Sequence, residues 1–250
     1  MIKPYHEEIN MKKFSDIINS ENFFNQSENF KKNKPFKFAF IEDFVSQEFY
    51  NKLYNSYPSF DKSWEDGSTM NKNQLVKNWG GNKKINVDGE KDPNFSQEWN
   101  EFKLFCESDE FISYIRKFSG VPVNKLKSFQ FLYYRKGGFQ MTHIHNAGPS
   151  TLILMFYLTK GWQKGDPGGT YISTDADDIP SKDNIIFEPY NLDNSLVIFH
   201  DGPNAAHGVR QITKDVTRLG VQIYLEEYTE AGWSGFTSQS DDEKNKRKTL

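Results

Sequence analysis

The second half of the chain alternates short apolar runs with turn-forming residues. Five runs follow one another from about Leu126: KSFQFLYYRKGG, STLILMFYLTKG, GGTYIST, NSLVIFHDG and RLGVQIYLEEY. They are rich in β-branched and aromatic residues and are separated by Gly, Pro, Asn and Asp, as short strands are. Strands at this spacing favour a sandwich or a barrel. We therefore predict a β-rich core over residues 121–230.

The first half of the chain predicts a layer of helices with one strand. In KPFKFAFIEDF the phenylalanines alternate with other residues, as in a half-buried strand. The following segment, SQEFYNKLYNSYP, repeats its apolar residues at helical spacing behind Ser46, a suitable N-cap. We expect a further helix from about Ser96 to Ser119, and one or two short helices within residues 1–33.

Two polar segments interrupt these patterns. Residues 61–95 are rich in Asn, Lys and Gly and contain Trp64 and Trp79. The segment is too long for a simple connection, so we expect a lid or binding loop, or partial disorder. Residues 238–250 contain no apolar residue before their end and are predicted to be disordered. The acidic loop TDADDIP offers carboxylates for Ca²⁺, but its spacing favours a solvated loop.

Composition narrows the class of protein. The 31 Lys and Arg nearly balance the 34 Asp and Glu, which does not favour a surface for nucleic acid. No apolar run is long enough to span a membrane, and the N-terminus lacks the apolar run of a signal peptide. The single cysteine, Cys106, lies on a helical apolar stripe and is expected to be a buried thiol. These features favour a cytoplasmic protein and leave its oligomeric state open.

The histidines are the first candidates for chemistry. His143, His145, His200 and His207 fall in the predicted β region, whereas His6 lies in the polar N-terminal segment. Residues two apart on a strand face the same side, so the first two imidazoles can reach one point. Three imidazoles suit Fe, Zn, Cu or Ni. Taken singly, each of these residues is more commonly a hydrogen-bonded structural histidine.

A family resemblance connects these runs. In order and spacing they resemble the prolyl-4-hydroxylase-like branch of the Fe(II)/2-oxoglutarate-dependent oxygenases, over about residues 35–230. The resemblance implies a mainly β fold with an N-terminal α layer, built on a double-stranded β-helix, a cupin-like jelly roll. It also implies a single oxygenase domain over residues 1–237, with residues 1–120 as the N-terminal layer. The segments that carry it are YYRKGGFQMTHIHN, LMFYLTKGW, DPGGTYI, NSLVIF and PNAAHGVRQITKDVTRLGVQIY.

The resemblance also implies a metal site. His143 matches the family's first ligand histidine, and His207 matches the distal one. The family has Asp where this chain has His145, and halogenating relatives have Ala or Gly there. We predict that His145 is the third ligand; Asp201, or another carboxylate, is the alternative for that place.

Further residues match the family's cosubstrate pocket. Arg218 matches the basic residue that pairs with the far carboxylate of 2-oxoglutarate, while Arg210 lies too close to the distal histidine for that role. Tyr157 resembles a tyrosine that assists this carboxylate, and Tyr134 matches one that lines the pocket; core packing is an equal alternative for both. His200, like Asp201, is a candidate for supporting the metal or contacting the substrate.

The expected function is that of a non-haem iron oxygenase. Fe(II), 2-oxoglutarate and O2 would together hydroxylate an unidentified substrate, which we expect to be a small molecule, a sugar or a peptide. Three-histidine sites also occur in cupin-type dioxygenases that need no 2-oxoglutarate, so such an enzyme is one alternative. A catalytically inactive metal- or ligand-binding module is the other.

Overall fold

The structure, a computed structural model, describes residues 14–80, 89–145, 148–174, 184–230 and 232–234. The acidic loop at 175–178 and the polar tail at 238–250 lie outside these ranges, as does His6. In the part of the chain that is described, no helix is long and apolar enough to cross a membrane.

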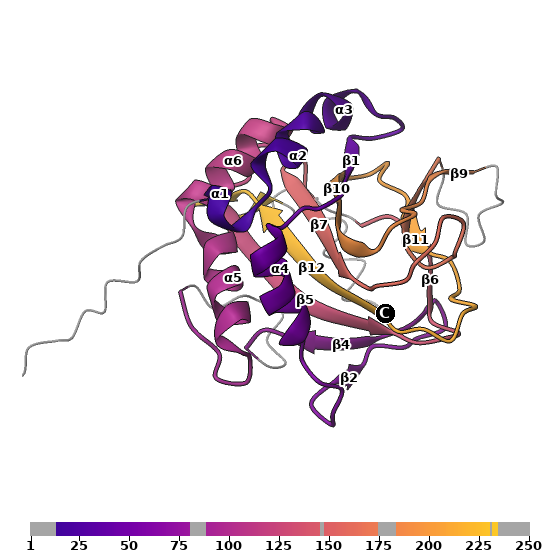
Figure 1. Ribbon diagram of the computed structural model, residues 1–250. Coiled ribbons are helices and arrows are strands. Elements are labelled where there is room, and N and C mark those ends of the chain that lie inside the picture. The colour runs from indigo at the N-terminus through magenta and orange to yellow at the C-terminus, as the bar shows by residue number, and fades with distance from the viewer. Residues whose placement is uncertain (1–13, 81–88, 146–147, 175–183, 231, 235–250) are drawn as a thin grey trace, which may run out of the picture.

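Two antiparallel sheets form the core of the fold (Figure 1). In spatial order, the larger sheet contains β1 (Phe38–Ile41), β10 (Asp193–Asp201), β7 (Thr151–Leu158), β12 (Arg218–Glu226), β5 (Lys125–Tyr134), β4 (Leu75–Asn78) and β2 (Glu65–Asp66). The smaller sheet contains β3 (Lys72–Asn73), β6 (Phe139–His143), β11 (His207–Val209), β8 (Thr170–Ser173) and β9 (Ile185–Phe187). A separate hairpin pairs β13 (Tyr228–Thr229) with β14 (Gly232–Trp233). The predicted jelly roll is confirmed.

Helices cover the outer face of the larger sheet (Figure 1). The expected short N-terminal helices are three in the described residues: α1 (Phe14–Ile17), α2 (Ser20–Asn25) and α3 (Ser27–Lys32). The amphipathic segment behind Ser46 forms α4 (Gln47–Asn55), although the Ser46 hydroxyl donates to the carbonyl of Asp16 and does not cap the helix. The remaining helices are α5 (Gln97–Glu107) and α6 (Asp109–Ser119).

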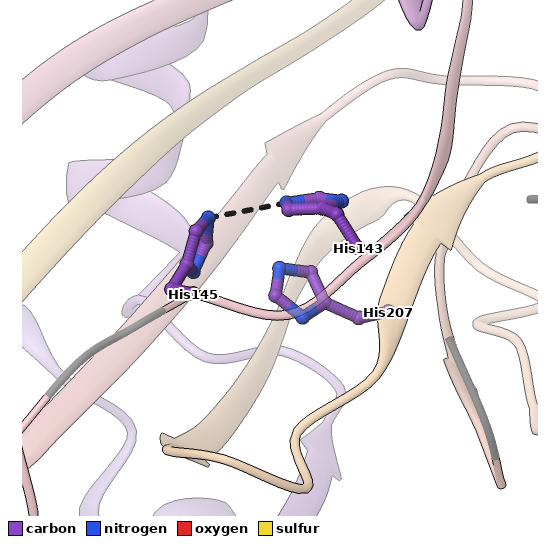
Figure 2. A group of neighbouring side chains, drawn as sticks. All are labelled: His143, His145 and His207. Atoms are coloured by element: carbon purple, nitrogen blue, oxygen red, sulfur yellow. Dashed lines mark hydrogen bonds between the residues drawn. The ribbon is translucent and has the colours of Figure 1, made fainter. Parts of the chain in front are cut away.

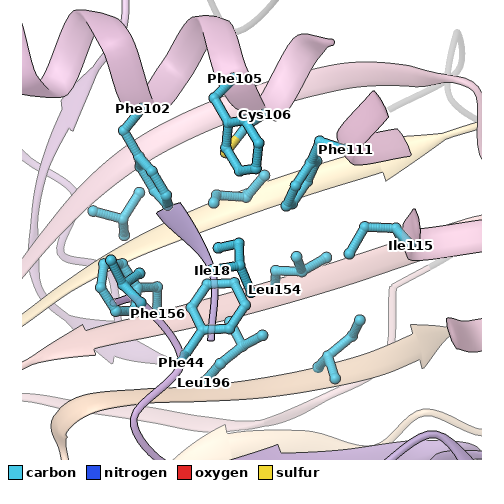
Figure 3. Close-up of a cluster of buried hydrophobic side chains, with 14 of the residues drawn as sticks. Ile18, Phe44, Phe102, Phe105, Cys106, Phe111, Ile115, Leu154, Phe156 and Leu196 are labelled. Atoms are coloured by element: carbon cyan, nitrogen blue, oxygen red, sulfur yellow. The ribbon is translucent and has the colours of Figure 1, made fainter. Parts of the chain in front are cut away.

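Strand β7 shows how one sheet faces two cores. All of its residues are buried, and successive side chains point to opposite faces. Leu154 and Phe156 join the helix-side cluster, where they face Phe102 and Phe111 (Figure 3). Ile153, Met155 and Tyr157 point to the other face and pack between the two sheets. Burial on both faces explains why this strand reads as a continuous apolar run.

The single helix expected over residues 96–119 is in fact two. Ser108 has an extended backbone, with φ −66° and ψ 147°, and it separates α5 from α6. Its hydroxyl accepts a hydrogen bond from the backbone N–H of Phe111 at 3.2 Å, as an N-cap does. Apolar spacing continues across the break, so the sequence pattern alone did not reveal it. Cys106, at the end of α5, is buried as predicted.

Part of the segment 61–95, which we expected to be a lid or binding loop or partly disordered, instead forms strands. Strands β2, β3 and β4 extend both sheets, and only residues 81–88 lie outside the described ranges. Trp64 and Trp79 are 7% and 3% exposed and belong to the helix-side core. The Trp79 ring stacks on Phe95 with centroids 4.5 Å apart. These indoles are therefore structural and do not form a surface for a ligand.

Candidate metal centre and adjoining cavity

The three predicted histidines come together between the sheets (Figure 2). Strands β6 and β11 are hydrogen-bonded neighbours, and their register places His143 directly opposite His207. His145 lies two residues beyond the end of β6, with its Nε2 3.1 Å from Nε2 of His143. One nitrogen from each ring lies within 4.8 Å of the others. This cluster combines two cross-strand neighbours with a third residue on the adjoining loop.

Hydrogen bonds fix the orientation of all three rings. Nδ1 of His143 lies 3.0 Å from the carbonyl of Met141, and Nδ1 of His207 lies 2.6 Å from the carbonyl of Ala205. Nδ1 of His145 lies 2.9 Å from Oδ2 of Asp201. A carbonyl or carboxylate oxygen can only accept, so each Nδ1 carries a hydrogen. Each neutral ring then presents an Nε2 lone pair.

These lone pairs fit a cation. Two acceptor nitrogens 3.1 Å apart repel one another unless a proton or a metal ion lies between them. Burial, and then the nearby His145 ring, lower the pKa of His143 to about 4. Burial lowers the pKa of His207 well below its ordinary value. Protonation of His143 and His207 is therefore disfavoured at neutral pH. Imidazole nitrogens bind zinc at about 2.0–2.1 Å, and two at a right angle would be about 3.0 Å apart.

Asp201 reaches the cluster through His145. Its carboxylate is fully buried and lies near the end of β10, where Oδ1 accepts from the N–H of Gly202 at 3.1 Å. Because its other oxygen binds Nδ1 of His145, Asp201 sets the orientation and tautomer of that ring. The group of converging ligand atoms contains the imidazole of His145 and not this carboxylate.

His200 does not join the cluster. It precedes Asp201 on β10, and alternation turns it to the opposite face of the strand. Its Nε2 lies 2.7 Å from the carbonyl of Pro149. The structure therefore separates the two candidates for supporting roles, and His200 has the structural role of a histidine that binds a backbone carbonyl.

A cavity between the sheets extends from the histidines to Arg218. His143 and His207 line one part, Arg218 another, and apolar side chains including Leu132, Ile153, Met155 and Phe199 line the walls. Gly208 also lines it, and a Cβ there would lie 2.4 Å from the hydroxyl of Tyr171, so the strands approach closely at this point. The cavity is thus polar at two places and apolar between them.

Arg218 is a fully buried cation with free donors. It opens β12 at 0% exposure, and its Nη2 donates to Oγ1 of Thr170 at 3.2 Å. Nε and Nη1 have no partner among the described residues. The guanidinium lies over the rings of Tyr134 and Tyr157, 4.5 Å and 5.0 Å from their centroids. A buried charge with unpaired donors is costly, and an anion would satisfy it.

The two predicted tyrosines flank this guanidinium. The Tyr157 hydroxyl accepts from the backbone N–H of Thr170 at 3.0 Å, which leaves its own hydrogen available. The Tyr134 hydroxyl donates to Oε1 of Gln74, and burial raises the pKa of this phenol to about 12. Arg210, the rival to Arg218, instead pairs with Glu188, to which its Nε donates at 2.7 Å.

Sequence reasoning missed the polar residues that connect these groups. Nε2 of Gln140 lies 3.3 Å from Nε2 of His143, and Gln140 also approaches the Tyr134 hydroxyl at 3.4 Å. Thr170 contacts both Arg218 and Tyr157. Their positions in the sequence were a weak indication that they belong to the site. Gln140 lies three residues before His143, and Thr170 follows the Gly-Gly pair.

Comparison with known proteins agrees with this architecture. No protein-family model matches the sequence, and no curated protein matches it. A prolyl-4-hydroxylase from Pseudomonas putida superposes with a TM-score of 0.55 at 13% identity, over 81% of this chain and 97% of that one. A Trichoplax adhaerens prolyl hydroxylase, in complex with a hypoxia-inducible factor peptide fragment, gives 0.55 at 13% identity, over 89% and 93%.

A third similar structure contains ligands. HygX from Streptomyces hygroscopicus, with nickel and 2-oxoglutarate bound, gives a TM-score of 0.52 at 11% identity, over 82% of this chain and 85% of that one. At these identities the likeness concerns the fold. The chain therefore has the jelly-roll fold of the prolyl hydroxylases and 2-oxoglutarate-dependent oxygenases, with a cluster of three histidines between its sheets.

Proposed function

We propose that the chain is an Fe(II)- and 2-oxoglutarate-dependent oxygenase that hydroxylates its substrate. His143, His145 and His207 would hold the iron, and Arg218 would hold the far carboxylate of 2-oxoglutarate. The observation that carries the proposal is the buried guanidinium with two unpartnered donors, which shares one cavity with two of the clustered histidines. A dicarboxylate with one end at the metal and the other at Arg218 satisfies both.

The chain's own residues bind and orient the cosubstrate. Nε and Nη1 of Arg218 offer charge-assisted hydrogen bonds, each worth about 1.5–3 kcal/mol. The Tyr157 hydroxyl still has a hydrogen to donate beside this pair. The apolar walls exclude water, which strengthens these contacts. Iron with bound 2-oxoglutarate and O2 would supply the oxidising power for hydroxylation at a C–H bond.

The alternatives explain fewer of these features. A three-histidine dioxygenase that binds its substrate directly would not need a buried guanidinium across the cavity. An inactive module that binds no metal would not need tautomers that present an Nε2 lone pair on each of the three rings. HygX, which has the same fold, binds nickel and 2-oxoglutarate. This supports the same pair of ligands here.

The test is binding and turnover of 2-oxoglutarate. We expect the anaerobic, Fe(II)-loaded protein to bind 2-oxoglutarate in calorimetry and to form succinate when O2 is admitted. Arg218→Met should weaken 2-oxoglutarate binding by about tenfold or more. Arg116→Met removes an exposed arginine from α6 and should leave binding unchanged. Wild-type protein that loads iron but neither binds nor consumes 2-oxoglutarate would favour the cosubstrate-independent dioxygenase.

A further inference from the structure

The inner face of the larger sheet changes its chemistry along the strands. Near Arg218 this face is apolar, with Leu132 and Met155 between the sheets. Farther along, Gln130 on β5 lies between Asn78 on β4 and Gln222 on β12, because it is in register with both. Three carboxamides therefore cross three adjacent strands. Apolar side chains would stabilise this inner face more than carboxamides do, so packing alone does not account for the row.

A groove opens over this polar part of the sheet, on the outer side of the histidine cluster. His145 and Asp201 line it, whereas His143 and His207 line the inner cavity. Tyr224, on the floor of the groove, has its ring centroid 6.1 Å from that of His145. The cluster thus stands between two spaces, and a molecule in the groove would lie beside the metal.

Polar groups in the groove have unused hydrogen-bonding capacity. Thr151 is 1% exposed, and its hydroxyl has no partner among the described residues. Nε2 of Gln130 donates to Oδ1 of Asn78 at 2.6 Å, an arrangement that leaves the Asn78 amide group and the Gln130 carbonyl available. Nε2 of Gln222, which lines the inner cavity, donates to the Tyr224 hydroxyl at 3.2 Å, so the Tyr224 hydroxyl in the groove can still donate.

The groove contains more acidic than basic side chains. Lys127 and Glu226 form an ion pair along one side. Glu65, Asp66 and Asp201 add three carboxylates, and Lys72 adds one further cation. Val76 and the ring of Tyr224 are the apolar side chains of its lining. The groove therefore offers many donors and acceptors, an excess of carboxylates and one aromatic face.

We propose that this groove binds a polyhydroxylated, sugar-like molecule, which is the substrate class of the enzyme. The role of this molecule as a substrate rests on the proposed function, whereas its binding in the groove does not require that function. Adjacent hydroxyl groups both donate and accept, as do the carboxamides and the free hydroxyls of Thr151 and Tyr224. A proline-rich peptide would need apolar pockets for its rings, and the groove supplies none beyond Val76 and Tyr224.

Saturation-transfer NMR and calorimetry with the full chain test this inference. The probes are a panel of neutral monosaccharides and disaccharides of hexoses, 6-deoxyhexoses and N-acetylated amino sugars, with a proline-rich peptide for comparison. We expect at least one saccharide to bind and the peptide not to bind. Replacing Gln130 and Asn78 together by Leu removes both members of a hydrogen-bonded pair, and it should weaken saccharide binding by about tenfold or more.

Thr151→Val separates binding from folding. The hydroxyl has no partner, so its replacement by a methyl should leave the thermal midpoint unchanged or higher, yet weaken saccharide binding severalfold. Thr159→Val is the matched control, because the Thr159 hydroxyl accepts from the N–H of Leu219 at 2.7 Å. That change should lower stability without altering the affinity of the folded protein.

The outcomes distinguish the two proposals. If saccharides bind while 2-oxoglutarate does not, the groove assignment stands and the oxygenase proposal fails. If 2-oxoglutarate binds while no saccharide in the panel does, or the peptide binds in the groove instead, the groove assignment is overturned. Unchanged saccharide affinity in both the Thr151→Val protein and the Gln130→Leu, Asn78→Leu protein would also overturn it.

Discussion

Asp201 acts on the proposed metal through His145, and this gives a test at the scale of single residues. Its buried carboxylate accepts from Nδ1 of His145 at 2.9 Å. Loss of such a supporting partner typically lowers metal affinity 10–100-fold. We expect a loss of about this size for Asp201→Ala, and a smaller one for Asp201→Asn, whose oxygen still accepts. Competition with a chromophoric chelator measures the affinity.

The neighbouring histidine is the control for this prediction. His200 lies on the opposite face of β10 and binds the carbonyl of Pro149. His200→Ala should therefore leave metal affinity unchanged. An equal loss in His200→Ala and Asp201→Ala would mean that the end of β10 acts through its fold and not through the carboxylate.

His145 itself is tested by two substitutions. We expect His145→Ala to lose bound iron, because it removes one of the three proposed ligands. Asp at this position restores the carboxylate of the family pattern, but it would face the buried carboxylate of Asp201. Iron retention by His145→Asp should therefore improve when Asp201→Asn is added. Full iron binding by His145→Ala would show that His145 is not a ligand.

Arg218 should contribute to 2-oxoglutarate binding but add little to the stability of the fold. Its buried guanidinium has two unpartnered donors, which lowers stability. The contacts of the guanidinium with the rings of Tyr134 and Tyr157 offset part of this cost. Replacing buried charges by apolar groups of similar size is often neutral or stabilising. In the absence of 2-oxoglutarate, we expect the free energy of unfolding of the Arg218→Met protein to lie within about 1 kcal/mol of the wild-type value, or above it. Urea denaturation measures this, and a large destabilisation would indicate a structural arginine.

At the scale of elements, the break between α5 and α6 depends on Ser108. Its hydroxyl caps α6 by accepting from the N–H of Phe111. Ser108→Ala should lower the free energy of unfolding by about 1 kcal/mol, the usual cost of losing an N-cap. Ser108→Thr is the control, because threonine keeps a hydroxyl that can cap the helix. Equal losses from the two substitutions would contradict this account.

At the scale of the whole molecule, the stability of the fold should increase with the concentration of the metal. The three proposed ligands come from β6, β11 and the loop beyond β6, so an unfolded chain cannot present them together. Binding at 100 times the dissociation constant would add about 2.7 kcal/mol. We expect added Ni²⁺ to raise the thermal midpoint and EDTA to reverse the shift. His143→Ala should abolish it; persistence of the shift would place the metal elsewhere.

The sequence by itself determined the main features of the fold. The short apolar runs that form β5 and β7 and the turn residues between the runs are local patterns, and they predicted the β-rich core. The ordered motifs also brought His143, His145, His207 and Arg218 forward as candidates, and the structure places all four around one cavity or its rim.

Tertiary structure decided what local periodicity cannot contain. Trp64 and Trp79 lie in a polar segment, yet distant helices bury them against the larger sheet. Asp201 and His200 are adjacent in sequence, but they lie on opposite faces of β10, and only Asp201 contacts the histidine cluster. The row formed by Asn78, Gln130 and Gln222 exists only through the register of three strands. Contacts between residues far apart in the chain depend on sheet order and burial, which no short stretch of sequence specifies.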